Sequence, residues 1–303
     1  GEVNRAIRIH QNLIARPTIL PQQRNLALFE LAQDYRHAGL LDRAEELFQE
    51  LVASQTHQVL ALRQLLDIYQ QEHDWVKAIR TAQQLASVNQ EPIHTEMAQY
   101  YCEQAEIHLK QRQDDAARQA IQYALKIDSS CVRASLLEGQ LALSQGNLLP
   151  AILAFKRVEQ QDPDYLAEVL EPLQICYQAL GKQSEFIHYL HHVLEYHGGI
   201  TPMLMLATLL KQRESEQQAA DFIAYQLHKQ PSLRCFDYLL DLALSKTAII
   251  THDHLLSLKE LTRQLLKNEP AYKCDQCGFT ARNLHWQCPS CKQWNTLKPR
   301  QEE

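Results

Sequence analysis

The chain has 303 residues, of which 45% are apolar and 22% charged, proportions that are ordinary for a globular protein and exclude a disordered chain. Its 30 lysines and arginines stand against 36 aspartates and glutamates, so the formal charge is −6 and gives no electrostatic reason to expect nucleic-acid binding. No apolar run reaches the roughly 20 residues of a membrane-spanning helix. We therefore expect this fragment to be soluble.

A helix-turn-helix pattern recurs at intervals of 34 to 39 residues from the start of the chain. In LFELAQDYRHAGLLDRAEELFQEL, Tyr35 precedes the turn residue Gly39, and the small residue Ala44 follows five positions later. A helix pair cannot bury its own apolar face, so pairs stack, and small residues allow close approach where helices cross. The residues at this small position in successive units are Ala6, Ala44, Ala78, Ala117, Ala151, Phe186, Ala220 and His254.

This pattern resembles the tetratricopeptide repeat, a 34-residue helix-turn-helix unit. The resemblance predicts an all-α superhelical solenoid over residues 1–267, built from a half repeat and about seven helix pairs. Phe186 and His254 replace the usual alanine, so we expect looser packing at those two crossings. The two longest intervals predict extended connections around residues 16–22 and 87–95.

The first helix of the pattern lacks a partner before it. Gly1 falls on the turn position, so GEVNRAIRIHQNL is expected to be only the second helix of a pair. A solenoid is expected to end in a capping element and not in an orphan half repeat. We therefore expect the native chain to extend further toward its N-terminus.

In arrays of this kind the first helices of successive pairs line a concave surface that binds peptides or protein segments. The pattern places polar side chains of several first helices on that surface. Polar positions on a helix otherwise face solvent without a further role. The residues that we predict as partner contacts there are Arg36, Arg63, Asp67 and Arg133.

Four of the eight cysteines lie close together near the end of the chain, in CDQCGFTARNLHWQCPSC. They form two Cys-x2-Cys pairs, Cys274 with Cys277 and Cys288 with Cys291. Four thiolates on two tight turns form the tetrahedral sulfur set that suits zinc or iron. We predict a metal-binding ribbon over residues 271–298, too short to fold without its metal.

The motifs CDQCGF and CPSC resemble the metal-binding turns of rubredoxins, in which iron carries single electrons. Gly278 follows one pair as in those proteins, but Lys292 stands where a second glycine is usual, and the loop between the pairs is short. A closed four-sulfur site also leaves no open position for chemistry. We therefore predict one structural zinc ion, with iron and a rubredoxin-like electron carrier as the alternative.

The ribbon also resembles the N-terminal zinc ribbon of a bacterial DNA-repair ATPase, through YKCDQCGF and WQCPSCKQWNT. This resemblance leaves a nucleic-acid-binding module as a second alternative. In a chain of net negative charge, however, the few basic residues of the ribbon are better explained as solvated charges, and we expect no nucleic-acid partner. These basic residues are Lys273, Arg282, Lys292, Lys298 and Arg300.

Two of the chain's three tryptophans, Trp286 and Trp294, lie in the ribbon. They are predicted either to pack the ribbon onto the last helices or to anchor a partner protein. Only residues 271–273 separate Pro270, which follows the last helix, from the first cysteine, so the ribbon cannot swing freely. We expect it to dock on the end of the helical array.

No enzyme motif is present in the sequence: there is no P-loop, GxGxxG, GxSxG or HExxH pattern. His188 and His192 have a spacing that can hold a metal on one helix face, but no third ligand accompanies them in sequence. A packing or solvent-facing role explains these histidines better. We therefore expect a protein that is not an enzyme.

The order of motifs, a tetratricopeptide array ending directly in YxCxxCGF…WxCPSCxxW, closely resembles the lipopolysaccharide assembly protein B family over the whole chain. The resemblance implies a single N-terminal membrane helix before this fragment and a place on the cytoplasmic face of the bacterial inner membrane. It also implies an adaptor that couples a membrane AAA+ protease to degradation of the deacetylase committing precursors to lipid A. Other lipopolysaccharide assembly proteins are implied as partners, and a homodimer is compatible with the family.

Overall fold

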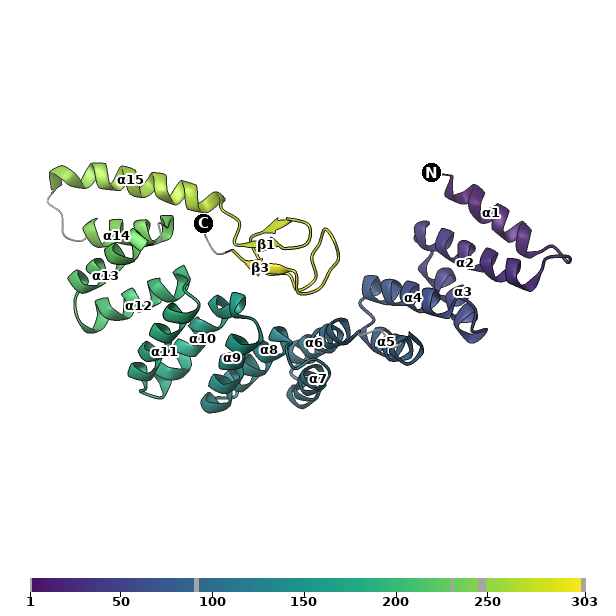
Figure 1. The fold of residues 1–303 in the computed structure, drawn as a ribbon, viewed down its shortest axis with the longest axis horizontal. Helices are drawn as coiled ribbons and strands as arrows, with labels where there is room; N and C mark the ends of the chain where they lie inside the picture. The colour runs from purple at the N-terminus through teal and green to yellow at the C-terminus, as the bar shows by residue number, and fades with distance from the viewer. Residues whose placement is uncertain (1, 90–92, 230–231, 245–248, 301–303) are drawn as a thin grey trace. The chain divides into compact units, whose positions relative to one another are not determined.

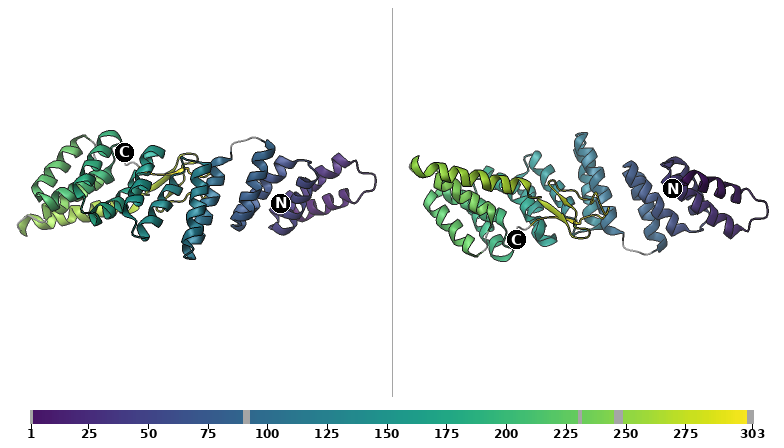
Figure 2. Two further views of the ribbon diagram at one scale, coloured as in Figure 1. Left: turned by 90° about the horizontal axis from the view of Figure 1, so that it is seen from below. Right: turned by 90° about the horizontal axis from the view of Figure 1, so that it is seen from above.

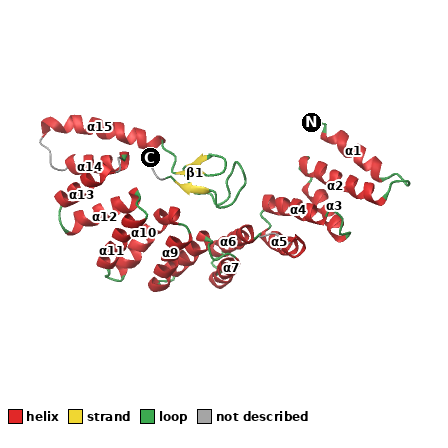
Figure 3. Ribbon diagram, viewed as in Figure 1, coloured by secondary structure: helices red, strands yellow, loops and turns green. Residues whose placement is uncertain are grey.

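The computed structural model describes residues 2–89, 93–229, 232–244 and 249–300 (Figure 1). Within the last range, the side chains of residues 249–255, 257, 267 and 268 are not among those described. The chain divides into two compact units, Gly1–Ser129 and Ser130–Glu303. Within these described ranges, helices account for most of both units, and the strands lie in one small region of the second (Figure 3).

The described residues of the first unit form a single helix followed by three helix pairs. The first helix of each pair has an even label, and each packs against the helix that follows it. The helices are α1 Val3–Ile14, α2 Pro21–His37, α3 Leu41–Ala53, α4 Gln58–Glu72, α5 Trp75–Asn89, α6 His94–Lys110 and α7 Asp114–Ile127.

Where the structure describes it, the second unit forms four helix pairs and a three-stranded ribbon. A short 3-10 helix, η1 Pro163–Tyr165, joins its first two pairs. The strands are β1 Tyr272–Cys274, β2 Thr280–Ala281 and β3 Leu297–Pro299, with β1 between the other two and antiparallel to both. The described elements confirm the predicted fold class of tetratricopeptide repeats with a small ribbon. The helices are α8 Val132–Ser144, α9 Leu148–Gln161, α10 Leu166–Ala179, α11 Gln183–Tyr196, α12 Ile200–Arg213, α13 Glu216–Lys229, α14 Leu233–Leu244 and α15 Ile249–Asn268.

The core between paired helices is formed by the small and aromatic positions of the repeat. Ala44, Ala78, Ala117 and Ala151 are fully buried. Phe186 takes the place of alanine in α11, where it is also buried and stacks on Tyr177 of α10 with ring centroids 5.6 Å apart. Helices α10 and α11 are less closely packed than α8 and α9, as the larger side chain predicts. The side chain of His254, the other exception, lies outside the described residues.

In the two longest intervals between repeats, only part of the additional sequence lies in the connections between helices. Helix α2 begins at Pro21, inside the predicted connection 16–22, and α6 begins at His94, inside the predicted connection 87–95. Both helices have 17 residues, compared with 15 in α4 and 13 in α8. Part of the extra sequence therefore lengthens the first helices, while residues 15–20 form a connection as predicted around 16–22. Residues 90–92 of the other predicted connection lie outside the described residues.

The turn inside each helix pair requires a left-handed backbone. The predicted turn glycines Gly39, Gly146 and Gly181 all have positive φ, whereas Gly1 lies outside the described residues. At the same position of two other pairs stand His73 and Arg112, with φ of 57° and 58°. Each of these turns closes with a backbone hydrogen bond from the next residue to a carbonyl in the preceding helix, such as Asp74 N to Tyr69 O at 2.9 Å. A residue with a Cβ is strained in this conformation.

Replacing His73 or Arg112 by glycine is therefore expected to stabilise the first unit. The free energy of unfolding should rise by roughly 0.5–1 kcal/mol for each substitution. Glycine relieves the strain of the left-handed backbone, and the greater freedom that it gives the unfolded chain offsets part of this gain. Chemical denaturation followed by circular dichroism measures it, and Gly39→Ala provides the opposite change, which should destabilise. Equal or lower stability of both glycine variants would contradict this account of the turns.

None of the helices in the described ranges is long and apolar enough to cross a membrane.

Candidate metal centre

The four cysteines of the ribbon converge although they come from two separate turns. Their Sγ atoms all lie within 4.8 Å of one another, with Cys274 and Cys291 at 3.8 Å and Cys277 and Cys288 at 3.7 Å. A metal at about 2.3 Å from four sulfurs of a regular tetrahedron would set them about 3.8 Å apart. The donor set and its spacing therefore fit a tetrahedral zinc or iron ion. Among the described residues, no other group of histidines, cysteines and carboxylates is arranged to hold a metal.

The two metal-binding turns have the same backbone geometry. Gly278 N donates to Cys274 O, and Lys292 N donates to Cys288 O, both at 2.9 Å. Their φ values are 74° and 61°, so Lys292 adopts the left-handed conformation that glycine adopts in the other turn. The departure from the usual glycine therefore leaves the fold of the turn unchanged and costs only local strain.

We expect Lys292→Gly to hold the metal more tightly. Glycine relieves the strain that a residue with a Cβ has in the left-handed backbone conformation, which is up to about 1 kcal/mol. The metal dissociation constant should therefore fall by up to roughly fivefold. Competition with a chromogenic chelator measures this, and Lys292→Ala, which removes the positive charge but keeps a Cβ at the left-handed position, is the control. The explanation fails if both substitutions change metal retention equally.

Hydrogen bonds favour the thiolate form of two of the cysteines. Burial raises the pKa of Cys274, but hydrogen bonds from Thr296 and from nearby backbone N–H groups outweigh it and bring the pKa to about 6. The backbone N–H of Phe279 lowers the pKa of Cys277. Burial raises the pKa of Cys288 to about 11. A bound cation would offset the cost of ionising this buried thiol, so the electrostatics also fit a metal.

The ribbon is docked against the beginning of α10 and not on the last helices. The ring of Trp286 stacks on that of Tyr165 in η1, with centroids 5.4 Å apart. Tyr165 is buried, and its hydroxyl donates to the carbonyl of Leu297 in β3 at 2.9 Å. Figure 2 shows the strands beside the helices that begin the second unit. The prediction that the ribbon docks on the end of the array is therefore wrong, because β3 turns back toward η1.

Polar contacts surround this docking contact. Tyr272 donates its hydroxyl to Oε1 of Glu168 in α10 at 2.7 Å, and Lys298 pairs with Asp162 just before η1. The ammonium group of Lys298 also lies 4.4 Å from the centre of the Tyr165 ring. Tyr165 was not predicted from the sequence. Its only signal is its place two residues after Pro163, where one repeat ends and the next begins.

The predicted partner contacts of the second unit differ in their surroundings. Arg133 of α8 is only 3% exposed, and its guanidinium carbon lies 5.8 Å from the centre of the Trp286 ring. The chain's own ribbon therefore covers Arg133, which corrects its prediction as an open groove residue. Trp294 is half-buried and pairs through its backbone with Gln287 inside the ribbon.

In the first unit, three predicted groove residues lie together. Arg36 of α2 donates from Nη1 to Oδ2 of Asp67 in α4 at 3.0 Å. Burial raises the pKa of Asp67, and the nearby charges of Arg36 and Arg63 oppose that rise. These residues therefore form one charged cluster across two first helices, and their role as partner contacts stays a prediction.

His192 of α11 and His197, just after that helix, have an acidic neighbour that the sequence did not reveal. Nε2 of His192 lies 2.9 Å from Oε1 of Glu159 in α9, and Nε2 of His197 lies 3.2 Å from the same oxygen. His188 instead contacts the backbone carbonyl of Ser184 within its own helix. Through its contact with Glu159, His192 therefore links α11 to α9, which are the second helices of neighbouring pairs.

Comparison with known proteins agrees with both parts of this structure. A family described as rubredoxin metal binding domain matches residues 272–299, and one described as tetratricopeptide repeat matches residues 102–165. Lipopolysaccharide assembly protein B of Escherichia coli strain K12 is 37% identical over 300 residues, which cover 99% of this chain and 77% of that protein. Its namesake from Haemophilus influenzae is 35% identical over 303 residues, with 99% and 76% covered. The crystal structure of MamA protein has 17% identity and a TM-score of 0.37, covering 63% of this chain and 92% of that one.

The fold and the four-cysteine site define a tetratricopeptide-repeat protein that carries a rubredoxin-like metal-binding ribbon. The relatives are named as assembly proteins, and tetratricopeptide repeats are scaffolds and not a family of enzymes. The chain belongs to the lipopolysaccharide assembly protein B family.

Proposed function

We propose that this chain is a non-enzymatic adaptor that restrains lipopolysaccharide synthesis. In this role it couples a membrane AAA+ protease to degradation of the deacetylase that commits precursors to lipid A. The observation that carries the proposal is the similarity to lipopolysaccharide assembly protein B, which extends over 99% of the chain and includes the ribbon. A helical-repeat scaffold supports it, because such a scaffold offers long surfaces for protein partners.

The adaptor would work at the cytoplasmic face of the bacterial inner membrane, anchored by an N-terminal helix that is not part of this sequence. Its partners would be the protease, the deacetylase and other lipopolysaccharide assembly proteins, and two copies would be able to form a homodimer. In the first unit, the cluster of Arg36, Arg63 and Asp67 is the proposed partner surface. In the ribbon, Trp294 is the proposed partner contact, because Trp286 is packed against the chain's own helices.

The proposed ligands of one zinc ion are Cys274, Cys277, Cys288 and Cys291. The ion would supply charge compensation and a covalent link between the two turns, and no open coordination position. The chain's own contribution is the hydrogen bonding of the thiolates by Thr296 and by the backbone of the two turns. A colourless protein with one equivalent of zinc by elemental analysis is expected, whereas a red protein loaded with iron would favour the electron carrier.

The test of the adaptor role is affinity capture from bacterial cells with three proteins. Intact protein and the Lys292→Gly variant are expected to retain the protease, the deacetylase or both. The Cys274→Ser/Cys277→Ser variant is expected to lose them, because its ribbon cannot hold the metal. The adaptor proposal is wrong if the intact protein retains neither.

A further inference from the structure

The ribbon contacts the helices through two aromatic side chains, and each of them lies two residues before a buried cysteine. Tyr272 precedes Cys274 and donates a hydrogen bond to α10, and Trp286 precedes Cys288 and stacks on η1. The exposed fractions of the two cysteines are 1% and 0%. Each docking side chain is therefore attached to the backbone of a turn that supplies a buried proposed ligand, so a change at the metal centre can reach the docking contact directly.

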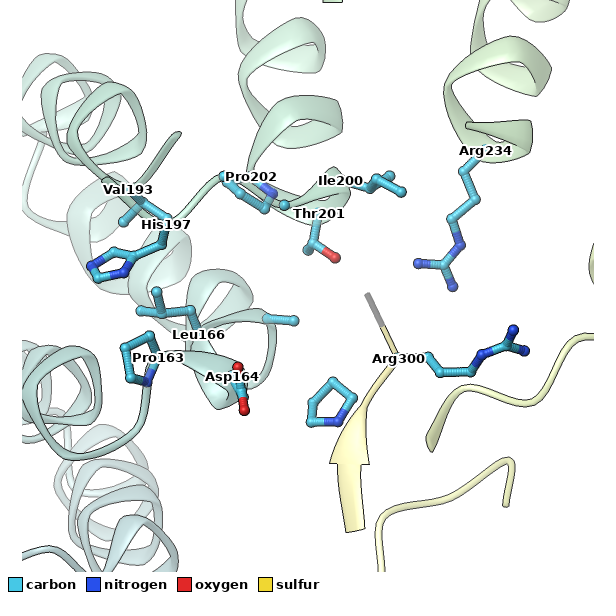
Figure 4. Close-up of a pocket in the computed structure, with 14 residues that line it drawn as sticks. Pro163, Asp164, Leu166, Val193, His197, Ile200, Thr201, Pro202, Arg234 and Arg300 are labelled. Atoms are coloured by element: carbon cyan, nitrogen blue, oxygen red, sulfur yellow. The ribbon is translucent and has the colours of Figure 1, made fainter. Parts of the chain in front are cut away.

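Beyond these contacts, the ribbon and the helices are separated by open space. A cavity of about 80 Å³ lies between the end of β3 and the beginnings of α10 and α12, and Figure 4 shows it between Asp164, Thr201 and Arg300. A second cavity, of about 270 Å³, shares Thr201 and Arg300 with the first. Docking therefore relies on a small set of contacts, which includes those of Tyr272 and Trp286.

The four proposed ligands differ in their exposure to solvent. Cys274 and Cys288 are buried and Cys291 is half-buried, but Cys277 is exposed. The Sγ atom of Cys277 lies 3.7 Å from that of Cys288 on the other turn. The thiolate is the nucleophilic and oxidisable form of cysteine, and a metal ligand is held in that form. Cys277 is therefore the ligand that a dissolved oxidant reaches, and a second thiolate lies close enough to react with the product.

We propose that the ribbon is a redox-sensitive switch, in which hydrogen peroxide oxidises Cys277 and thereby releases the metal and the docking contact. The thiolate of Cys277 attacks the peroxide: an S–O bond forms, the O–O bond breaks, and hydroxide takes a proton and leaves as water. The thiolate of Cys288 then attacks the sulfenic sulfur, and the new S–S bond expels a second hydroxide, which also leaves as water. Two thiolates have then lost two electrons, and one peroxide has been reduced to two waters.

Oxidation removes half of the metal ligands at once. Only the thiolates of Cys274 and Cys291 remain, and two sulfurs do not retain a zinc ion that four sulfurs hold. Reduction of the disulfide by a small thiol, followed by zinc binding, restores the four-sulfur site. The inference rests on the proposed zinc ligands and goes beyond the adaptor role, which it does not require.

The same reaction acts on the docking contact. A separation of 3.7 Å is beyond bonding distance, so the turn that carries Cys288 must move toward Cys277, and Trp286 in the same segment moves with it. Loss of the metal and displacement of Trp286 together release the ribbon from η1. Arg133 and Tyr165, which are buried beneath it, then become exposed.

The test is treatment of the zinc-loaded intact protein with hydrogen peroxide, with zinc release followed by a chromogenic chelator. The bound zinc is expected to leave, and mass spectrometry after alkylation should find a disulfide between Cys277 and Cys288. Hydrogen exchange in η1 and the first turn of α10 should become faster, and dithiothreitol with added zinc should restore its slow rate. The buried cysteines of the helices should stay reduced and serve as an internal control; they are Cys102, Cys131, Cys176 and Cys235.

Two variants separate the exposed thiolate from metal binding as such. Three cysteines and one histidine form a common zinc site, so Cys277→His and Cys291→His are both expected to bind zinc. Peroxide should release zinc from Cys277→His about tenfold more slowly than from the intact protein, because the exposed thiolate is gone. Cys291→His keeps Cys277 and Cys288 and should remain sensitive to peroxide.

A second measurement needs no variant. Brief alkylation of the zinc-loaded protein with N-ethylmaleimide should modify Cys277 before the other three ligands. The switch is overturned if peroxide leaves the zinc bound, if both histidine variants release zinc as fast as the intact protein, or if Cys274 or Cys288 is alkylated first. A protein that binds no zinc would overturn the zinc site and the switch together, whereas failure of affinity capture would overturn the adaptor role alone.

Discussion

Removing the metal from the intact protein is expected to unfold residues 272–299 as one unit while the first unit keeps its helices. The strands have two or three residues each, and the buried core of the ribbon consists of Cys274, Cys288 and Leu297. Two of these core residues are proposed ligands, so losing the metal also removes what holds the core together. So few apolar groups cannot offset the conformational entropy of folding some 30 residues.

Titration with a strong chelator, followed by tryptophan fluorescence, measures this transition. Trp286 and Trp294 lie in the ribbon, and the third tryptophan, Trp75, lies in the first unit and should not change. The Cys274→Ser/Cys277→Ser variant is the control, because a chelator should have no further effect on it. Hydrogen exchange that stays slow in β1 and β3 after complete metal removal would contradict the prediction.

The unfolding should also spread into the helices that the ribbon covers. Tyr165 and Arg133 are 2% and 3% exposed in the folded protein, and both contact Trp286. Once the ribbon is lost, η1 and the first turn of α10 are expected to exchange faster with solvent, whereas α13 should not. The metal site and the start of α10 would then behave as one cooperative unit.

The repeating part of the fold could be predicted because its determinants are local in sequence. Each pair buries its apolar face against its neighbours, so a small residue at a regular interval indicates each helix crossing. These residues include Ala44, Ala78, Ala117 and Ala151. The four cysteines were equally clear, since two Cys-x2-Cys turns have few alternative explanations. In both cases the residue type and its spacing carry the structural requirement.

The docking of the ribbon could not be predicted in the same way. The bond from the hydroxyl of Tyr165 to Leu297 joins residues 132 positions apart, and no periodic pattern connects them. The left-handed turns at His73, Arg112 and Lys292 were missed for a related reason. Their positions in the repeat or in the metal-binding turn require a left-handed backbone conformation, but residues of these types do not indicate one. Position within a motif was therefore a better guide than residue identity.

Trp286→Ala is expected to undock the ribbon without releasing its metal. Trp286 packs against the apolar core that α8 to α12 share, through its contact with Tyr165. Truncation of a fully buried tryptophan costs about 3 kcal/mol or more, and because Trp286 is half-buried we expect a smaller loss of roughly 2 kcal/mol. The stack with Tyr165 and the contact with Arg133 are part of that loss. The four sulfurs and the two turns are untouched, so the ribbon itself should remain folded.

Elemental analysis and chemical denaturation separate the two effects. The variant is expected to keep one equivalent of metal while the second unit unfolds at a markedly lower denaturant concentration. Trp294→Ala is the comparison variant, since Trp294 lies in the same ribbon, whereas Trp286 packs against the helical core. It should lower the denaturation midpoint less than Trp286→Ala does. Similar losses of stability in both variants would show that Trp286 has no special part in docking. Loss of metal from Trp286→Ala alone would show that docking and metal binding are a single event, because a ribbon that needs the helices to hold its metal has no independent fold.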